Sequence, residues 1–298
     1  MGFQVIKVTM IALAAVLASM VMLTPAALAQ QQPPPDTGFT LLTDEVVGDF
    51  KYIADNIQMD AVDVVTSPLY VASDNSVLRS PNFYLGAAGA AAAIGGAFAL
   101  DQTMRAQLRD MKHSTAADLE NLSYGGVGAA SALVYAYGLY SDDAKVRETM
   151  LTGAESAGVA SLIVLGLKPA FGRLRPYQDH HSHTKFFDGG ASFPSGEVTP
   201  MFSLAAGVSE AFDNRWYVAI PAYSLATLDG FGRMGHDAHW FSDVVGAAIL
   251  GAGTTELLLY LHRRHATELD RWRIFPVNGT SPGKGGDTPS GLGISYNW

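Results

Sequence analysis

The sequence predicts an all-α protein, a helical bundle of about six core helices with an N-terminal amphipathic collar. Apolar stretches of helix length recur along the chain, and no segment shows the alternation typical of a half-buried strand. These stretches begin near Phe83, Tyr124, Met150, Val198, Trp216 and Val244. With 298 residues, of which 48% are hydrophobic and 16% charged, the chain can bury one good-sized core. We therefore expect a single bundle domain over residues 81–272.

The N-terminal end of the chain has the composition of an export signal. Lys7 precedes the apolar run MIALAAVLASMVML, and Pro25 and the Ala27-Leu28-Ala29 cleavage pattern follow it. This pattern predicts a secretory signal peptide over residues 1–29, with an uncleaved anchor helix as the alternative. We therefore expect a protein that is exported to the cell envelope.

The segments that flank the bundle differ from it in composition. Residues 30–43 contain the polar, proline-rich tract QQPPPDTG, which predicts a linker. In residues 44–80, apolar residues recur among acidic ones, which indicates amphipathic helices lying against the core or a membrane surface. Residues 273–298 form a tail rich in Gly, Pro and Ser that ends in an alternating aromatic stretch. We interpret this tail as disordered, with one edge strand or a partner-docking segment as the alternative.

The composition does not decide whether the bundle crosses a membrane. Several apolar stretches are shorter than the roughly 20 residues of a membrane span, and GAAGAAAAIGG is only weakly hydrophobic. Small residues pack closely in membrane bundles and in soluble ones. Glu155, Glu210 and Glu256 interrupt apolar stretches and are unfavourable against lipid but tolerable in a polar cleft. We expect a membrane-embedded bundle, with a soluble bundle as the alternative.

Charge and residue usage exclude several classes of protein. The formal net charge of -9 gives no basic surface for nucleic acid, so we expect no such partner. The absence of cysteine excludes disulfides, thiolate metal sites and a cysteine nucleophile. His180, His181 and His183 lie together, but no carboxylates accompany them at helical spacing. We interpret them as a loop near the site and expect no metal or other cofactor; the oligomeric state is not indicated.

The first of three polar clusters is KPAFGRLRP, at the end of an apolar stretch. Lys168 and Arg175 are seven residues apart, and Pro176 follows at once. Two cations here either stabilise a helix C-terminus through its dipole or clamp a phosphate. In the second case Arg175 binds two oxygens and Lys168 supplies a point charge. We expect Arg173, between them, to face solvent.

The second cluster is FPSGE, residues 193–197, directly before an apolar stretch. A Pro-Ser-Gly turn that opens a helix presents backbone amides and the hydroxyl of Ser195, which together with Gly196 form an anion site. The alternative is that Ser195 only caps the helix.

The third cluster is GRMGHDAHWFSD. Arg233 precedes His239 by six residues, and Asp243 follows it by four, which places imidazole and carboxylate on one helix face. Asp243 can accept the Nδ1 proton of His239 and leave Nε2 as a nucleophilic lone pair, while Arg233 holds a phosphate. A pair on the helix surface with no chemical role is the alternative.

Together the order Lys-x6-Arg-Pro, Pro-Ser-Gly and Arg-x5-His-x3-Asp resembles the three-part signature of the type 2 phosphatidic acid phosphatase and vanadium haloperoxidase superfamily. The resemblance covers roughly residues 150–264. It implies that His239 becomes transiently phosphorylated, that Asp243 orients it, and that no metal is required. It also implies a set of phosphate-binding residues, namely Lys168, Arg175, Ser195, Gly196 and Arg233.

Two positions depart from the pattern of that superfamily. Gly232 stands where the superfamily normally has Ser, and Glu197 stands where it normally has the His that protonates the leaving group. A Glu is a general acid when burial and neighbouring anions raise its pKa, whereas an ionised Glu repels phosphate. Three interpretations follow: Glu197 is the acid, His236 replaces it, or ester hydrolysis is weakened.

The resemblance implies a phosphatase that hydrolyses phosphate monoesters or diphosphates. We expect it to act on phosphorylated lipids at the envelope, with a site that faces the periplasm. A soluble periplasmic acid phosphatase acting on small phosphate esters is the nearest alternative. A vanadium haloperoxidase would hold vanadate in the same residues, but such enzymes use the histidine that Glu197 replaces. A catalytically weakened, lipid-binding member is the third alternative.

Overall fold

The structure is a computed structural model that describes residues 46–49, 51, 53, 81–179, 184–277 and 291–296. The predicted signal peptide, the linker, most of the predicted collar and the three clustered histidines lie outside the described residues. The chain divides into two compact units, Met1–Gly48 and Asp49–Trp298. The helices and the site described below all belong to the second unit.

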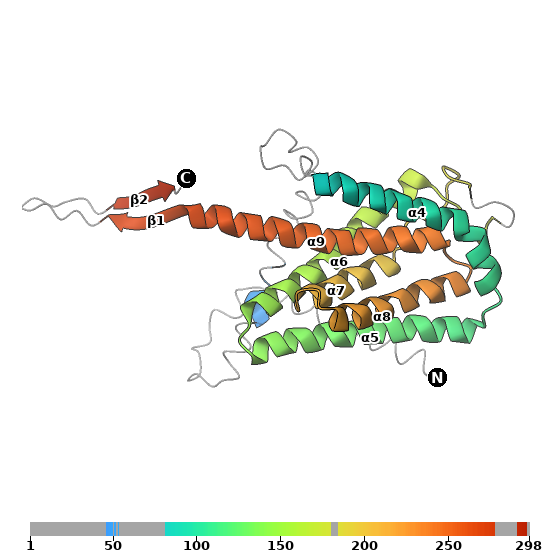
Figure 1. The fold of residues 1–298 in the computed structure, drawn as a ribbon, viewed down its shortest axis with the longest axis horizontal. Helices are drawn as coiled ribbons and strands as arrows, with labels where there is room; N and C mark the ends of the chain where they lie inside the picture. The colour runs from blue at the N-terminus through green and yellow to red at the C-terminus, as the bar shows by residue number, and fades with distance from the viewer. Residues whose placement is uncertain are drawn as a thin grey trace, which may run out of the picture. The chain divides into compact units, whose positions relative to one another are not determined.

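The second unit is a bundle of long helices (Figure 1). In chain order they are α4 (Pro81–Leu108), α5 (His113–Tyr140), α6 (Ala144–Phe171), α7 (Val198–Glu210), α8 (Trp216–Gly235) and α9 (Phe241–Arg271). Within residues 81–271, no described segment forms a strand, which confirms the predicted all-α class.

Two short strands follow the last helix. Strands β1 (Trp272–Val277) and β2 (Gly291–Tyr296) pair in an antiparallel hairpin, with Trp272 opposite Tyr296 and Val277 opposite Gly291. Both strands lie almost entirely in the tail, residues 273–298, for which the sequence predicts disorder or, as the alternative, one edge strand. The described part of this tail forms a strand pair.

Helix α7 lies at the centre of the bundle and packs against α5, α6, α8 and α9. Glycines let two of its neighbours approach its backbone closely. A Cβ on Gly153 of α6 would lie 3.1 Å from the Cα of Gly207, and one on Gly251 of α9 would lie 2.2 Å from the carbonyl oxygen of Thr199. The small residues of the sequence thus bring α6 and α9 directly onto α7.

Two apolar clusters hold these helices in register. The first joins α5, α6, α7 and α8 and consists of Val127, Val146, Met150, Ala205, Val208, Ala211, Ala222 and Ala226. The second joins α7, α8 and α9 near the loops at one end of the bundle and consists of Val198, Met234, Val244 and Ala247. Burial of apolar surface in the second cluster fixes the helix ends that carry the polar clusters.

The bundle has the apolar exterior expected of a membrane-embedded protein. Among the described residues, three helices are long and apolar enough to cross a membrane, Tyr84–Leu108, Ala144–Phe171 and Phe241–Arg263. Large apolar side chains also lie exposed on several helices, such as Leu85 on α4 (71% exposed) and Trp216 on α8 (73%). Exposed large apolar side chains on helices of this length favour contact with lipid or with a partner.

The three acidic residues inside the apolar stretches differ in their surroundings: Glu155 is buried, Glu210 lines a cleft and Glu256 is exposed. Glu155 is buried, with one carboxylate oxygen 3.9 Å from Nε2 of His262. A cleft of about 580 Å³ opens beside it, between the start of α6, the end of α7 and α9, and Glu210 and Arg263 line it. Glu155 and Glu210 therefore avoid the cost of placing a charge against lipid.

Candidate active site

The predicted site residues come together at one end of the bundle. This end holds the C-terminal ends of α6 and α8 and the N-terminal ends of α7 and α9. Helix α6 stops here because Gly172 adopts a left-handed conformation with φ 52°, and its N–H donates to the carbonyl of Lys168 at 2.8 Å. The residues after Phe171 are therefore in a loop, and helical spacing does not set the directions of their side chains.

His239 lies in the short loop between α8 and α9 and is only 2% exposed. Its Nε2 is 3.5 Å from Oε2 of Glu197, and its Nδ1 is 3.6 Å from Oδ2 of Asp243. Neither ring nitrogen has a hydrogen-bond partner within the described part of the chain. The imidazole thus lies between two carboxylates, in an arrangement that a bound substrate can tighten into hydrogen bonds.

Asp243, in the first turn of α9, is fully buried and held by several donors. The backbone N–H of Trp240 donates to Oδ2 at 2.9 Å, and the hydroxyl of Ser192 donates to the same oxygen. A guanidinium nitrogen of Arg173 donates to Oδ1 at 2.5 Å. The carboxylate therefore has a fixed position and can orient His239 in turn.

The prediction that Arg173 faces solvent is wrong. Arg173 is 1% exposed and donates to Asp243, to the hydroxyl of Ser242 at 2.7 Å and to Asp101 at 2.6 Å. It leaves α6 just after Gly172, so helical spacing does not set its direction. A buried cation of this kind balances the charge that Asp243 carries next to His239.

Sequence reasoning also missed Asp101, on α4. Asp101 is fully buried, and its two oxygens accept from Arg173 and from the backbone N–H and hydroxyl of Ser242, both at 2.8 Å. One signal was present: Asp101 is a lone acid within the apolar, Ala- and Gly-rich sequence of α4. A charge in such a place is rare unless it is paired.

Lys168 and the turn before α7 form one wall of the site. The ammonium of Lys168 donates to the carbonyl of Ala191 at 3.0 Å, and a Cβ on Gly196 would lie 3.5 Å from Cε of Lys168. Ser195 is fully buried, and its hydroxyl has no hydrogen-bond partner within the described residues. Its N–H donates to the carbonyl of Asp243 at 3.2 Å, which ties this turn to α9.

The alternative role of Ser195 as a helix cap is not what the structure shows. The residue at the N-cap of α7 is Glu197, whose side chain makes no capping hydrogen bond. The buried hydroxyl of Ser195 therefore remains available to an oxyanion. The N-termini of α7 and α9 both open at this end, and their dipoles favour negative charge there.

Arg175 interacts electrostatically with Lys168. A turn fixes its backbone, since its N–H donates to the side chain of Gln178 at 2.9 Å. The charges of Arg175 and Arg233 both act on Lys168, as do those of Glu197 and Asp243. Three cations from two helix ends and one loop thus share a single region.

Arg233, in the last turn of α8, contacts two carboxylates. Its Nη2 is 3.1 Å from Oε1 of Glu197, and its Nη1 is 3.7 Å from Oε1 of Glu120 on α5. The neighbouring Gly232 leaves no room for a side chain, because a Cβ there would lie 2.5 Å from Cγ of Glu120 and 2.7 Å from the carbonyl oxygen of Ala116. The glycine that departs from the resembled pattern is therefore required by the close packing of α5 on α8.

The environment of Glu197 favours its ionised form. The proximity of His239 and the charge of Arg233 hold the pKa of this carboxyl well below its usual range, although partial burial opposes the shift. In the substrate-free protein Glu197 is thus an anion beside Nε2 of His239. Its role as a general acid remains a prediction, and it requires the bound substrate to change this environment.

His236, the alternative acid, has other contacts. It follows α8 as the C-cap residue, and its ring lies against His113, with the two Nδ1 atoms 3.0 Å apart. Its Nε2 is 3.6 Å from Oε1 of Glu120. The contacts of its ring thus lead to α5 rather than to His239.

Residues 151–266 match the family model of the PAP2 superfamily. This match agrees with the resemblance that the three motifs of the sequence carry. The matched part contains every predicted site residue, from Lys168 to Asp243. Asp101 and Glu120, which the structure adds to the surroundings of the site, precede the matched residues.

Two known proteins are similar to the chain over part of its length. Lipid A 1-phosphatase of Porphyromonas gingivalis is 34% identical over 94 residues, which are 30% of this chain and 18% of that protein. The chain thus spans about a fifth of that relative. A solved structure, the first transmembrane PAP2 type phosphatidylglycerolphosphate phosphatase from Bacillus subtilis, matches with a TM-score of 0.40 and 19% identity. That match covers 61% of this chain and 94% of the other.

Proposed function

We propose that the protein is a phosphatase of the PAP2 superfamily that hydrolyses phosphate esters or diphosphates through a phosphohistidine on His239. One observation carries the proposal. The buried imidazole of His239 has the carboxylate of Asp243 near its Nδ1, and Glu197 contacts both its Nε2 and the guanidinium of Arg233. A nucleophile with an orienting acid and a nearby set of fixed cations is what phosphoryl transfer needs.

In this mechanism the cations bind the substrate before any bond changes. Arg233 and Arg175 fork across phosphoryl oxygens, and Lys168 adds a point charge. The hydroxyl of Ser195 and the turn amide of Gly196 donate to the remaining oxygen. These donors are fixed by the bundle, so they stabilise charge in the transition state with little reorganisation.

The reaction then proceeds in two displacements. Nε2 of His239 forms a bond to phosphorus while the bond to the leaving oxygen breaks, and protonated Glu197 gives its proton to that oxygen. Water next attacks the phosphohistidine, gives its proton to the Glu197 carboxylate and releases phosphate. Asp243 stabilises the positive charge on His239 during both steps, through the Nδ1 proton.

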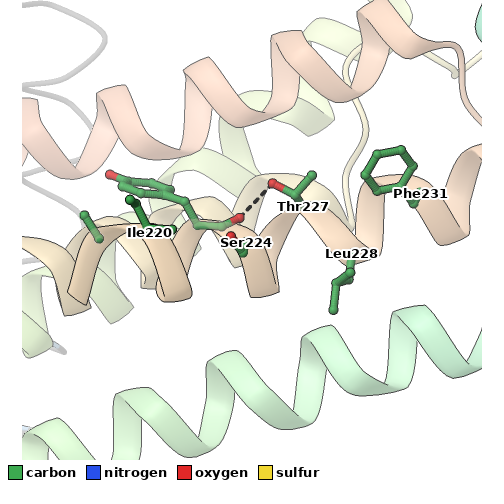
Figure 2. A pocket seen from close by; sticks show the side chains of 7 residues that line it. Ile220, Ser224, Thr227, Leu228 and Phe231 are labelled. Carbon is green, nitrogen blue, oxygen red and sulfur yellow. Dashed lines mark hydrogen bonds between the residues drawn. The ribbon is translucent and has the colours of Figure 1, made fainter. Parts of the chain in front are cut away.

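We infer that the substrate is a lipid phosphate at the cell envelope. A shallow, mostly apolar groove of about 510 Å³ runs along α8 (Figure 2). Its lining residues are Ala219, Ile220, Tyr223, Ser224, Thr227, Leu228 and Phe231. Figure 2 shows Thr227 and Phe231 on the side of α8 that faces α9.

This groove leads toward the site. Phe231, at its end, packs against the cluster that contains Val198 and Val244, whose chain neighbours are Glu197 and Asp243. An acyl chain in the groove would therefore approach the reacting phosphate along α8. The similarity to a protein named lipid A 1-phosphatase points to the same class of substrate.

The test is a panel of lipid phosphates and soluble phosphate esters offered to the purified full chain. We expect release of inorganic phosphate, faster from the lipid phosphates, and at least a thousandfold loss in His239→Ala, since the nucleophile is absent. His113→Ala, in which an exposed histidine at the start of α5 is removed, is the matched control. Equal activity of His239→Ala and the control would refute the proposal.

A separate experiment tests membrane embedding and the side that the site faces. We expect the protein to stay in the membrane fraction after a high-salt wash and to enter solution only with detergent, because its helices expose large apolar side chains. In intact cells, a substrate that cannot cross the inner membrane should be hydrolysed. Release by salt alone would instead favour the soluble acid phosphatase.

A further inference from the structure

The carboxylate of Glu197 occupies the place that the mechanism reserves for phosphate. Its Oε1 is 3.1 Å from Arg233, and its Oε2 is 3.5 Å from Nε2 of His239. A reacting phosphorus must stand about 3–3.5 Å from the nucleophile, with its oxygens on the cations. The Glu197 carboxylate and a phosphoryl group therefore cannot keep the same contacts at the same time.

We propose that Glu197 fills the phosphate position in the substrate-free protein and takes up a proton when a phosphate displaces it. The inference rests on the proposed function and explains how a carboxylate can stand in the place of the usual histidine. In the empty site the Glu197 anion partners Arg233 and His239. In the occupied site it becomes the proton donor for the leaving group.

The charged groups around Glu197 carry this exchange. Arg233 from α8 and His239 from the following loop contact Glu197 directly. The positive charge of Lys168 on α6 also interacts with Glu197. Asp229, one turn before Arg233 on α8, interacts through its charge with Arg233 and with Glu197. From α5, Glu120 reaches Arg233 at 3.7 Å.

A bound phosphate changes this balance. It takes the contacts with Arg233 and His239 for its own oxygens, so Glu197 loses the two partners that favour its anion. Its remaining neighbours then include the dianionic phosphate and Asp229, whose charge acts on Glu197. Like charges at short range favour the protonated carboxyl, as in other paired acids. A protonated Glu197 donates a hydrogen bond to phosphate instead of repelling it.

The test measures proton uptake when inorganic phosphate binds to the full chain in detergent. Titration calorimetry in buffers of different ionisation enthalpy gives the number of protons bound with each phosphate. We expect the wild type to take up about one proton more than Glu197→Gln, because the titration of phosphate itself is the same in both. The affinity of the wild type should also fall about tenfold for each pH unit above neutrality, relative to the variant.

Two further variants sharpen the result. Glu148→Gln, at an exposed position near the start of α6, should behave as the wild type. Glu197→His should bind phosphate without the extra proton at alkaline pH. Thermal unfolding of each variant checks that the fold is kept.

The inference is overturned if Glu197→Gln binds phosphate no more tightly than the wild type at alkaline pH, or if the two take up equal numbers of protons. Its failure is distinct from failure of the proposed function, because phosphate release by wild type and His239→Ala tests the nucleophile alone.

Discussion

Asp243 and Asp101 share one buried guanidinium, that of Arg173. Two carboxylates and one cation carry a net negative charge, which favours a positive charge on the adjacent His239 as its Nε2 forms a bond to phosphorus. The position of Asp243 therefore depends on Arg173, which no motif identified, and on Asp101 from α4, which lies outside the matched region. At the scale of single residues, the nucleophile is held by a network rather than by Asp243 alone.

This network predicts the effect of removing its cation. Arg173→Ala leaves two buried carboxylates unpaired, and we expect it to lower the free energy of unfolding by about 3–5 kcal/mol. Arg173→Lys keeps the charge but loses the fork, so it should fold and hydrolyse substrate at least tenfold more slowly. Arg109→Ala, at an exposed arginine of the segment after α4, is the control and should change stability by less than about 0.5 kcal/mol. Equal stability of Arg173→Ala and Arg109→Ala would contradict the account.

Asp229 predicts a dependence of stability on pH. Burial raises the pKa of this carboxyl to about 7, well above its value in an unfolded chain. The folded protein therefore binds the extra proton between about pH 4 and pH 7, and the stability it confers is lost as the pH rises through about 7. The Tm of the wild type should therefore decrease from about pH 4 to about pH 7. Asp229→Asn should lack the part of this decrease that comes from Asp229, whereas Asp118→Asn, at an exposed position, should keep it. Parallel Tm curves for Asp229→Asn and wild type would show that this carboxyl does not titrate as described.

Helix packing sets the geometry at the next scale, because the site is made of helix ends. Gly251 of α9 lies directly against the backbone of Thr199 on α7. Helix α9 carries Asp243, and α7 begins directly after Glu197. A change in the distance between α7 and α9 would therefore move the two carboxylates that flank His239.

A pair of glycines in α9 tests this packing. We expect Gly251→Ala to destabilise the protein by about 1–3 kcal/mol and to lower turnover, since its Cβ would meet a carbonyl oxygen that cannot move freely. Gly253→Ala is the matched control: nothing lies within 4 Å of its Cβ, and helix propensity makes it neutral or stabilising by up to about 1 kcal/mol. Thermal unfolding and phosphate release measure both effects. A stable and active Gly251→Ala would contradict the described contact.

Helix boundaries show where sequence patterns succeed and where they do not. Apolar stretches located α4, α7 and α8 closely, because the faces of these helices are mainly apolar. Helix α5 begins at His113, well before the predicted start near Tyr124, because its first turns carry polar residues such as Glu120 that line the site. Arg173 could not be placed by spacing, since its partner Asp101 is 72 residues away and the two meet because α4 and α6 both pack on α9.

At the scale of the whole molecule, the bundle collects fixed positive charge within a chain whose net charge is -9. The three-part signature predicted which residues form the site, since each motif follows or begins a helix and the antiparallel helices bring those ends together. It did not predict the contacts of Glu197, because these depend on the distances between α7, α8 and the loop before α9. The extra acids from α5 and α8, Glu120 and Asp229, also lay outside every motif.

Trapping of the phosphoenzyme shows whether His239 is the nucleophile. The full chain is mixed with a phosphorylated substrate, quenched in alkali within the first turnovers, and mapped by peptide mass spectrometry. We predict phosphate on His239 in the wild type, a larger trapped fraction in Glu197→Gln if water attack is slowed, and none in His239→Ala. A wild-type protein that releases phosphate while His239 stays unmodified, or that carries the label on another residue, would contradict the account.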